Sequence, residues 1–306
     1  MPANHCLVIG DINIDFAIHS ERYPEEGGEA HARQADLRLG GSGCITAVML
    51  QLLGIPTMLA GNLGDDLFGQ FALGHIDHSG LDMSLIQRMP GEQSGFFMIL
   101  VTPGGQRTMF GNRGANAAPL PLEKIISRLD TFTHVHVSGY TLLGDEQYAV
   151  VSSILKEASS RGLSISLDPG VCTLQQVPER VMALLRYVSI FLPSQDELSV
   201  LSGARDVQAG IKFLQENYSG SIVLKLGAQG SRFIDGHLDV SEPVANSGGL
   251  QVVDTTGAGD SFDAGFLAAV LNGKSPREAL ADGNAQALRL ITSQHGIIDL
   301  ISTQRV

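Results

Sequence analysis

The residues best suited to chemistry lie in one stretch near the C-terminus, which has the sequence D-T-T-G-A-G-D-S-F over residues 254–262. A β-branched pair, Val252-Val253, precedes it and an apolar pattern of helical period follows it, so we expect a strand, a glycine turn and a helix. Gly257 and Gly259 allow backbone conformations that other residues avoid, and they leave the N–H groups accessible. The first N–H groups of a helix lack internal partners and carry partial positive charge. The turn therefore predicts an anion site, whose usual ligand is phosphate.

Asp260 places a carboxylate beside that anion site, where it would repel a phosphoryl group unless it had a chemical task. The natural task is to accept the proton of a hydroxyl that attacks the phosphorus. The alternative is a tight turn before a core helix, with Asp260 acting only as a capping residue. The length and order of the nine-residue string favour phosphoryl transfer.

The string resembles the C-terminal motif of the ribokinase-like (pfkB) carbohydrate kinases, D-T-x-G-A-G-D-x-F. The resemblance implies that Asp260 is the catalytic base and that the amides of Gly257, Ala258 and Gly259 form the anion hole. It extends over nearly the whole chain. It implies an ATP-dependent kinase that phosphorylates a primary hydroxyl of a small sugar or sugar-like substrate, with Mg²⁺ bridging the phosphates.

Composition and charge exclude several other classes of protein. Hydrophobic residues make up 43% of the 306 residues, which is enough for a substantial core. The 32 acidic residues against 20 basic ones give a net charge of −12, which argues against a nucleic-acid or anionic-membrane partner. Three widely spaced cysteines, no secretory signal and no apolar run of transmembrane length predict a cytoplasmic protein with reduced thiols. We find no repeat or interdomain linker, so we expect one ribokinase-like domain over residues 1–306.

Short apolar strands alternate with amphipathic helices from about residue 134 onward. This pattern predicts an α/β fold, with three αβα layers around a mostly parallel central sheet. Ligands of such sheets bind at the carboxyl ends of the strands. The positions expected to meet at that edge are Asp11, Gly139, Tyr140, Asp168, Ser194, Gly227 and Asp260.

Two segments do not follow this alternation. Residues 17–39 are polar and lack a helical period, and residues 95–110 predict a hairpin. In the family, such segments form a small β-sheet lid that covers the sugar and often makes the dimer contact. The resemblance therefore implies lid inserts at approximately 12–38 and 95–115 and a homodimer formed through the lid.

The resemblance also implies where the sugar binds. Asn13 and Asp15 match a family N-x-D whose Asp accepts hydrogen bonds from sugar hydroxyls, and the Gly40-Gly41 backbone matches a glycine motif that contacts the sugar. Ile45 stands where that motif has a sugar-binding Asn, which makes ribose itself a weaker expectation. The candidate substrate-binding residues are Asn13, Asp15, Gly40, Gly41, Arg107, Tyr140 and Asp260, with a surface position as the alternative for Arg107.

A further set of positions matches the nucleotide and metal motifs of the family. Glu197 matches a Glu tied to Mg²⁺, and Ser194 replaces the Asn of that motif. Asp254 and Thr256 match positions that bind a monovalent cation, such as K⁺, in some relatives. Asn284 matches a contact on the adenine side, with a solvent-facing position as the alternative. The candidate nucleotide-binding residues are Ser194, Lys225, Gly227, Gly230 and Asn284, and the candidate metal ligands are Glu197, Asp254 and Thr256.

Two other functions stay open at this point. A nucleoside kinase of the same family would need a base pocket, which Phe96, Phe97, Phe110 or Tyr140 could supply. A non-catalytic sugar-binding relative would explain the departures at Ile45 and Ser194, but the intact G-A-G-D sequence opposes it.

Overall fold

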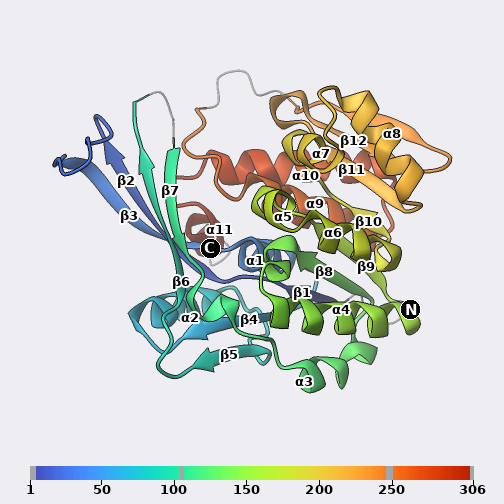
Figure 1. The fold of residues 1–306 in the computed structure, drawn as a ribbon, viewed down its shortest axis with the longest axis horizontal. Coiled ribbons are helices and arrows are strands. Elements are labelled where there is room, and N and C mark those ends of the chain that lie inside the picture. Colours follow the sequence, from blue (N-terminus) through green and yellow to red (C-terminus); the bar gives the residue numbers. More distant parts are fainter. Residues whose placement is uncertain (1–4, 104–106, 246–250, 304–306) are drawn as a thin grey trace.

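Nine strands form the central sheet of the computed structural model, which describes residues 5–103, 107–245 and 251–303 (Figure 1). The seven strands from β11 to β5 are parallel, whereas β12 and β13 form an antiparallel edge. In spatial order the strands are β13 (Asp239–Glu242), β12 (Ser231–Ile234), β11 (Ser221–Lys225), β10 (Ile190–Phe191), β9 (Ser164–Asp168), β8 (His134–Ser138), β1 (Cys6–Ile9), β4 (Thr57–Gly64) and β5 (Ile86–Met89).

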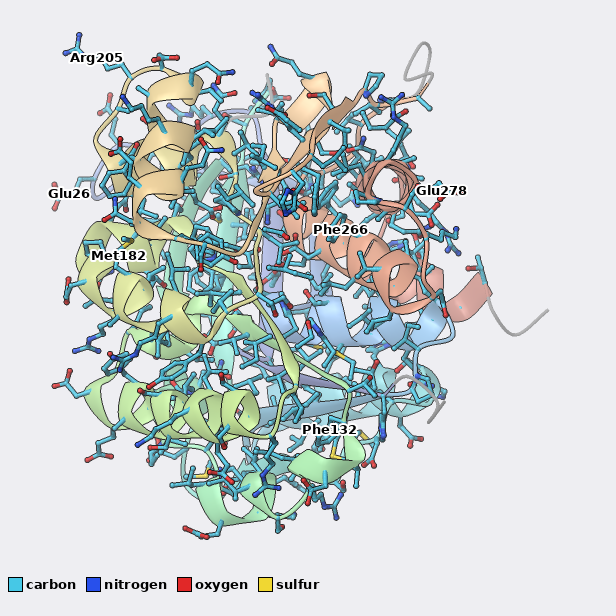
Figure 2. All side chains as sticks on the ribbon, turned by 90° about the vertical axis from the view of Figure 1, so that its right-hand side faces the viewer. Glu26, Phe132, Met182, Arg205, Phe266 and Glu278 are labelled. Carbon is cyan, nitrogen blue, oxygen red and sulfur yellow. The ribbon has the colours of Figure 1, made fainter. Side chains whose placement is uncertain are left out.

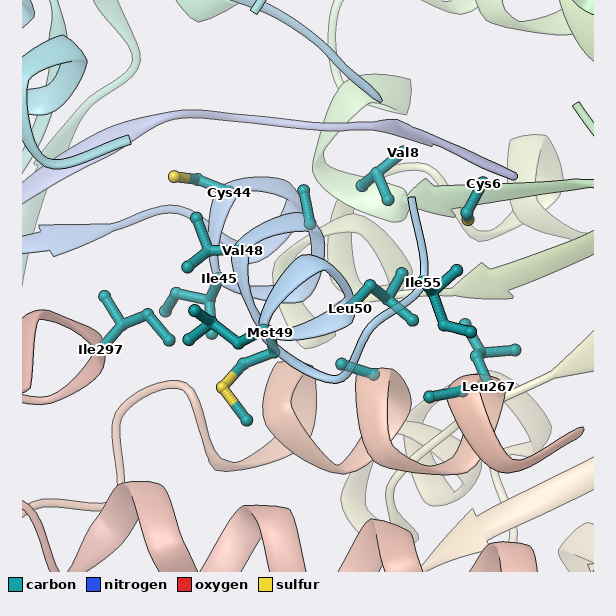
Figure 3. Close-up of a cluster of buried hydrophobic side chains, with 14 of the residues drawn as sticks. Cys6, Val8, Cys44, Ile45, Val48, Met49, Leu50, Ile55, Leu267 and Ile297 are labelled. Carbon is teal, nitrogen blue, oxygen red and sulfur yellow. The ribbon is translucent and has the colours of Figure 1, made fainter. Parts of the chain in front are cut away.

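Helices cover both faces of this sheet, and the alternation of side chains along β1 shows why. Cys6 and Val8 pack into one buried cluster with α1 (Ser42–Leu52), α9 (Ala258–Leu271) and α10 (Pro276–Ile291), part of which is drawn in Figure 3. Leu7 and Ile9 point to the opposite cluster, under α4 (Asp145–Ser160) and α8 (Val207–Asn217). Because successive residues of a strand point to opposite faces, a short apolar strand of this kind must be covered twice. The three-layer αβα fold is confirmed.

These layers enclose apolar side chains and leave charged ones at the surface (Figure 2). Phe266 of α9 lies inside the molecule, whereas charged residues such as Arg205 and Glu278 extend from its surface (Figure 2). No helix in the described ranges is long and apolar enough to cross a membrane. The other α-helices are α2 (Leu67–His78), α3 (Leu122–Ile126), α5 (Val171–Gln176), α6 (Pro178–Leu184), α7 (Gln195–Ser202) and α11 (Ile297–Thr303).

A second sheet of four strands projects from one side of the main body (Figure 1). Its order is β3 (Ala32–Gly40), β2 (Asn13–Ser20), β6 (Gly95–Val101) and β7 (Arg107–Asn112). These strands correspond to the two expected lid inserts, and the predicted turn at 103–105 lies partly outside the described residues. In register, Asp15 stands between Arg38 and Phe97, so these three side chains share one face of the lid.

Local side-chain hydrogen bonds define where two of the helices start. Asp66 accepts a hydrogen bond from Gly69 N at the start of α2, and Ser275 closes a capping box at the start of α10. One prediction was wrong: Val252-Val253 does not form a strand. Val253 N donates instead to Ile291 O at 2.8 Å. The segment therefore runs beside the end of α10, and it pairs with no strand of the described residues.

Candidate active site

One cavity of about 680 Å³ opens at the carboxyl edge of the central sheet, beneath the lid. Loops that follow β1, β8, β9, β10 and β11 contribute to its lining, as the parallel topology requires. Of the seven positions expected at this edge, all except Gly139 line the cavity. They are Asp11, Tyr140, Asp168, Ser194, Gly227 and Asp260.

The start of α9 forms one wall of the cavity. Gly257 caps the helix in the left-handed conformation, with φ of 78°, and a Cβ there would lie 2.8 Å from both Ile45 and Leu290. Within the described residues, the N–H groups of Gly257 and Gly259 have no hydrogen-bond acceptor, whereas Ala258 N donates to Thr255 O at 3.2 Å. Two of the three predicted anion-hole amides are therefore available to a ligand.

Asp260 lies in the first turn of α9 and faces the cavity. Its burial and the nearby negative charge of Asp168 raise the pKa of its carboxyl to about 6, although a hydrogen bond from Ser42 opposes the shift. Its own backbone carbonyl is held by the Thr46 hydroxyl at 3.3 Å. A carboxylate with this pKa is ionised at neutral pH and is a stronger base than an ordinary Asp.

Lys225 ends β11 and lies among buried carboxylates. Its ammonium donates to Asp168 at 3.0 Å and to both oxygens of Asp263 at 3.2 Å. Burial works against the charged form, but Asp168, Asp263 and Glu197 outweigh it and raise the pKa of Lys225. Burial raises the pKa of Asp263, whereas Lys225 keeps the pKa of Asp168 low. The ammonium also lies 3.5 Å from where a Cβ of Gly259 would be, so it adds positive charge beside the free amides.

The predicted sugar-binding residues gather where the lid meets the main body. The Asp15 carboxylate packs against Gly40, where any side chain would overlap it, and no described residue donates a hydrogen bond to it. Burial and the charges of Asp254 and Asp260 raise its pKa to about 7. Asn13 lines the same end, and Gly41, with φ of 93°, caps α1 beside it. Asp15 therefore presents an unsatisfied acceptor to the cavity.

Two arginines of the lid converge on the loop before α9. Arg38 donates to Asp254 Oδ2 at 2.7 Å, and Arg107 donates to Asp254 Oδ1 at 3.4 Å and to the Thr256 hydroxyl at 2.9 Å. Asp254 Oδ1 also accepts from the backbone N–H and the hydroxyl of Thr256, both at 2.8 Å. Arg107 lines the cavity, so it joins the lid to the helix start at the edge of the site.

Ser194 and Glu197 form a capping box at the start of α7. Glu197 accepts from Ser194 N at 2.7 Å, and Ser194 accepts from Glu197 N at 3.2 Å. Both residues line the cavity. Burial and the negative charge of Asp168 raise the pKa of Glu197 to about 7.

The end of the cavity next to α10 is lined mainly by apolar side chains. Asn284 of α10 lines it but donates to Glu242 O at 3.0 Å, so it holds α10 to the end of β13. Gly230, with φ of 97°, lies against Glu242 O, where a side chain would collide. The other residues that line this end are apolar, so together they can hold a flat apolar group. They are Val244, Val252, Ala287, Leu288 and Ile291.

Of the four aromatic residues considered for a base pocket, the structure brings two to the cavity. Phe97 and Tyr140 line it. Phe96 packs against Phe68 at 6.0 Å between ring centroids, and Phe110 is 55% exposed on the other face of the lid. Strand alternation explains this division, because Phe96 and Phe97 are neighbours in β6 and must point to opposite faces.

Sequence reasoning missed two residues that shape the site, Arg38 and Asp263, and gave no protein partner for two others, Asn116 and Arg113. Arg38 and Asp263 were not singled out, although Asp263 lies one helical turn after Asp260, where a second inward carboxylate could have been suspected. Asn116 bonds Ile12 N and O, both at 3.0 Å, and so fixes the start of β2. Arg113 pairs with the buried Asp11 at 3.1 Å. No local pattern identifies this last pair, because its partners are 102 positions apart.

Comparison with known proteins shows that the chain is similar to carbohydrate kinases. The family model described as pfkB family carbohydrate kinase matches residues 3–303. The chain is 30% identical to a ribokinase of Arabidopsis thaliana, over 92% of this chain and 74% of that protein. It is 27% identical to an ATP-dependent ribose-1-phosphate kinase of Halopiger xanaduensis, over 91% and 89% of the two chains. The solved structure of the Arabidopsis thaliana ribokinase complexed with ribose and ATP superimposes with a TM-score of 0.82 and 25% identity, covering 99% and 98% of the two chains.

Proposed function

Since the chain belongs to the pfkB family and is a carbohydrate kinase, we propose that it transfers the γ-phosphoryl group of ATP to a primary hydroxyl of a small sugar or sugar-like substrate. The observation that carries this proposal is the helix start in which a cavity-lining Asp260 stands beside the unpartnered amides of Gly257 and Gly259. A proton acceptor and a fixed set of donors for phosphoryl oxygens are what this reaction needs.

In the proposed reaction, the acceptor hydroxyl attacks the γ-phosphorus of ATP and Asp260 accepts its proton. A new oxygen–phosphorus bond forms, the bond from the γ-phosphorus to the bridging oxygen breaks, and ADP leaves with that electron pair. Gly257 and Gly259 donate to the transferring phosphoryl group, and Lys225 lies close enough to add positive charge. Asp15 accepts hydrogen bonds from other hydroxyls of the acceptor, since no protein group uses its carboxylate.

The apolar end of the cavity suits the adenine ring of ATP. Ala287, Leu288 and Ile291 of α10 would cover one side of the base, and the Gly227–Gly230 turn leaves room for ribose and phosphates. Ser194 and Lys225 also line the cavity. We therefore assign Ser194, Lys225 and the Gly227–Gly230 turn to nucleotide binding in this proposal.

The carboxylates of the site fit a divalent cation such as Mg²⁺. Glu197 and Asp168 line the cavity, and their mutual repulsion contributes to the raised pKa of Glu197. Mg²⁺ usually takes one or two carboxylates and completes its shell with phosphates and water, so two carboxylates are enough for it. When bound, Mg²⁺ would neutralise phosphate charge, and Glu197 and Asp168 would hold it directly or through water.

A monovalent cation does not fit the side chains expected to bind it. The Asp254 carboxylate is already neutralised by Arg38 and Arg107, and the Thr256 hydroxyl is bonded to Arg107 and Asp254. We therefore predict that replacing K⁺ by Na⁺ or tetramethylammonium at constant ionic strength changes kcat less than about twofold. Initial rates of ADP release measure this. Activation by K⁺ of tenfold or more would contradict the prediction and would point to a site built from backbone carbonyls.

The lid supports the proposed homodimer. Leu37, Met98 and Phe110 lie in one row with Phe16 across the four strands, on the face turned away from the cavity. Leu37 is 41% exposed, Met98 40% and Phe110 55%. An apolar row of this kind is covered when a second copy packs its own lid against it.

The kinase activity is tested directly by transfer of radiolabelled phosphate from Mg-ATP to a panel of pentoses, hexoses, sugar acids and nucleosides. Transfer to at least one acceptor supports the proposal. Binding of acceptors without any transfer would favour the non-catalytic alternative.

The same assay, run at saturating Mg-ATP, predicts a characteristic pH profile for the acceptor, because two raised carboxyl pKa values belong to groups proposed to contact it. Asp15, with a pKa of about 7, and Asp260, with a pKa of about 6, must both be ionised to accept hydrogen bonds and a proton. We expect log kcat/KM to fall with slope 1 as the pH drops below about 7, and with a slope approaching 2 below about 6. Asp15→Asn should leave a single slope below about 6. A profile that stays flat to pH 5 would contradict the base assignment.

A further inference from the structure

Arg38 is a buried cation that lies close to the main cavity without lining it. Its side chain belongs to β3 of the lid and is 9% exposed. Nη1 donates to Asp254 Oδ2 at 2.7 Å, and Nη2 lies 3.9 Å from the Asp36 carboxylate. Within the described residues, the Arg38 Nε–H has no hydrogen-bond acceptor. Burying a guanidinium with one N–H unsatisfied costs stability, which points to a task for its charge.

The carboxylate that Arg38 binds shapes the loop before α9. Asp254 Oδ1 accepts from the backbone N–H and from the hydroxyl of Thr256, both at 2.8 Å. The next residue is Gly257, whose N–H is one of the two unpartnered amides at the helix start. Because Asp254 fixes the backbone of Thr256, it also orients the planar peptide group that carries the Gly257 N–H. Arg38 therefore reaches the predicted anion site through one side chain and one loop residue.

This loop needs a positive charge because several acidic side chains interact around it. Burial and the charges of Asp254 and Asp260 raise the pKa of Asp15, whereas the charge of Arg38 opposes this rise. Burial also works against ionisation of Asp254, but hydrogen bonds from Thr256 and the arginine charges of the lid outweigh it and lower the pKa of its carboxyl. Without Arg38, the ionised Asp254 would face two other acidic groups with less compensation.

Arg107 is the other arginine of the lid that contacts this loop, and its charge is less effective there. Its Nη1 lies 3.4 Å from Asp254 Oδ1 and donates mainly to the Thr256 hydroxyl, at 2.9 Å. The Arg107 side chain is 32% exposed, compared with 9% for Arg38, so water screens its charge more strongly. Arg38 is therefore the main countercharge of Asp254.

A small cavity of about 20 Å³ adjoins the guanidinium. Its wall includes Arg38, Asp254 and Thr256, and it includes Ser293 and Gly296 from the segment after α10. This volume holds about one water molecule, and K⁺ is of similar size. Truncation of Arg38 would widen the cavity beside the Asp254 carboxylate, which would then have room for a small cation.

We propose that Arg38 provides, from within the chain, the positive charge that a bound monovalent cation would otherwise bring to this loop, and that it thereby positions the Gly257 amide for the phosphoryl group. The inference rests on the proposed kinase function. Arg38 is a positioning residue, since it acts through Asp254 and lies outside the main cavity. It follows that a variant without this guanidinium acquires a requirement for a small cation.

The test compares Arg38→Ala with the wild type in the chlorides of K⁺, guanidinium and tetramethylammonium, at equal and low ionic strength. Tetramethylammonium is too large for the widened cavity and serves as the inert cation. The readouts are kcat and KM for the acceptor that the kinase panel identifies, and the midpoint of thermal unfolding. A pH well above 7 favours the ionised form of Asp15, which limits the indirect effect of Arg38 on that carboxyl.

Four further variants separate charge from packing. Arg38→Lys keeps the charge, whereas Arg38→Met keeps similar bulk without it. Arg38→Ala combined with Asp254→Asn removes the carboxylate that would attract the cation. Arg33→Ala is the matched control, because Arg33 belongs to the same strand and its side chain is 74% exposed.

In tetramethylammonium, Arg38→Ala and Arg38→Met should lose kcat by roughly 10–100-fold, the scale on which misplaced catalytic groups act. The acceptor KM should change far less, because Arg38 does not line the cavity. K⁺ or guanidinium should restore most of the kcat of Arg38→Ala and raise its unfolding midpoint. Neither cation should do so for the wild type, Arg33→Ala or the double variant, and Arg38→Lys should stay close to the wild type.

Wild-type kcat for Arg38→Ala in tetramethylammonium would overturn the inference, and so would a loss that neither K⁺ nor guanidinium restores. If Arg38→Ala folds in none of the salts, equal kcat values for Arg38→Lys and Arg38→Met would refute the inference, and activity in Arg38→Lys alone would support it. If the wild type phosphorylates no acceptor, the kinase proposal fails separately. The unfolding midpoints then decide the inference: stabilisation by K⁺ or guanidinium that is confined to Arg38→Ala supports a cation site at Asp254, and its absence refutes one.

Discussion

Asp260→Asn should fold as the wild type does and lose kcat by about 10²–10⁴-fold, the range that general base catalysis usually supplies. The amide has nearly the shape of the carboxylate but cannot accept the hydroxyl proton. Binding of ATP should persist, since the amides of Gly257 and Gly259 are backbone groups and stay in place. Single-turnover phosphoryl transfer measures the chemical step, and titration with ATP measures nucleotide affinity.

The free energy of unfolding separates a catalytic role from a structural one. The folded-state pKa of Asp260 is raised to about 6, so its ionised form is disfavoured by folding, and this cost is present above the unfolded-state pKa. Removing the charge should therefore leave the free energy of unfolding at pH 7 unchanged or raise it. Asp206→Asn is the matched control, because it makes the same change at the start of α8, outside the cavity. Retention of more than about a tenth of wild-type kcat would refute the base assignment.

The geometry of the α9 start was predictable from sequence because its causes are local. Gly257 needs a left-handed backbone, Asp260 follows three positions later, and both facts are contained in one nine-residue string. The same holds for the capping box of Ser275 and Glu278 and for the cap of α2 at Asp66. Each of these depends on side chains and backbone groups within one helical turn.

Long-range pairing was not predictable in the same way. Asp254 was expected to bind a monovalent cation, but Arg38, which precedes it by 216 positions, binds its carboxylate. Val252-Val253 has strand propensity, yet the end of α10 takes its backbone hydrogen bonds. The division of Phe96 from Phe97 depends on the register of β6 in the lid, which no single strand specifies. In each case the deciding partner is supplied by tertiary structure.

Lys225→Met should lower the free energy of unfolding by about 3–5 kcal/mol at pH 7, the usual result of removing one partner of a buried ion pair. The Lys225 side chain is 11% exposed and that of Asp168 10%, so water cannot replace the lost ammonium. Urea denaturation measures this change. Lys212→Met on α8 is the control, because that lysine is 77% exposed and its nearest carboxylate oxygen is 3.9 Å away; it should change the free energy of unfolding by less than about 0.5 kcal/mol.

The pH dependence identifies the cause of the loss. In the wild type, Lys225 holds the pKa of Asp168 below its ordinary value, so this carboxylate contributes stability above its unfolded-state pKa that is lost as the pH falls. Without the ammonium, burial should raise the pKa of Asp168, and protonation should then restore stability as the pH falls. The variant and the wild type should therefore converge as the pH falls below 7, and Lys225→Met combined with Asp168→Asn should recover part of the loss at pH 7. A deficit that is independent of pH would mean that packing of the lysine stem, and not its charge, holds β11 against α9.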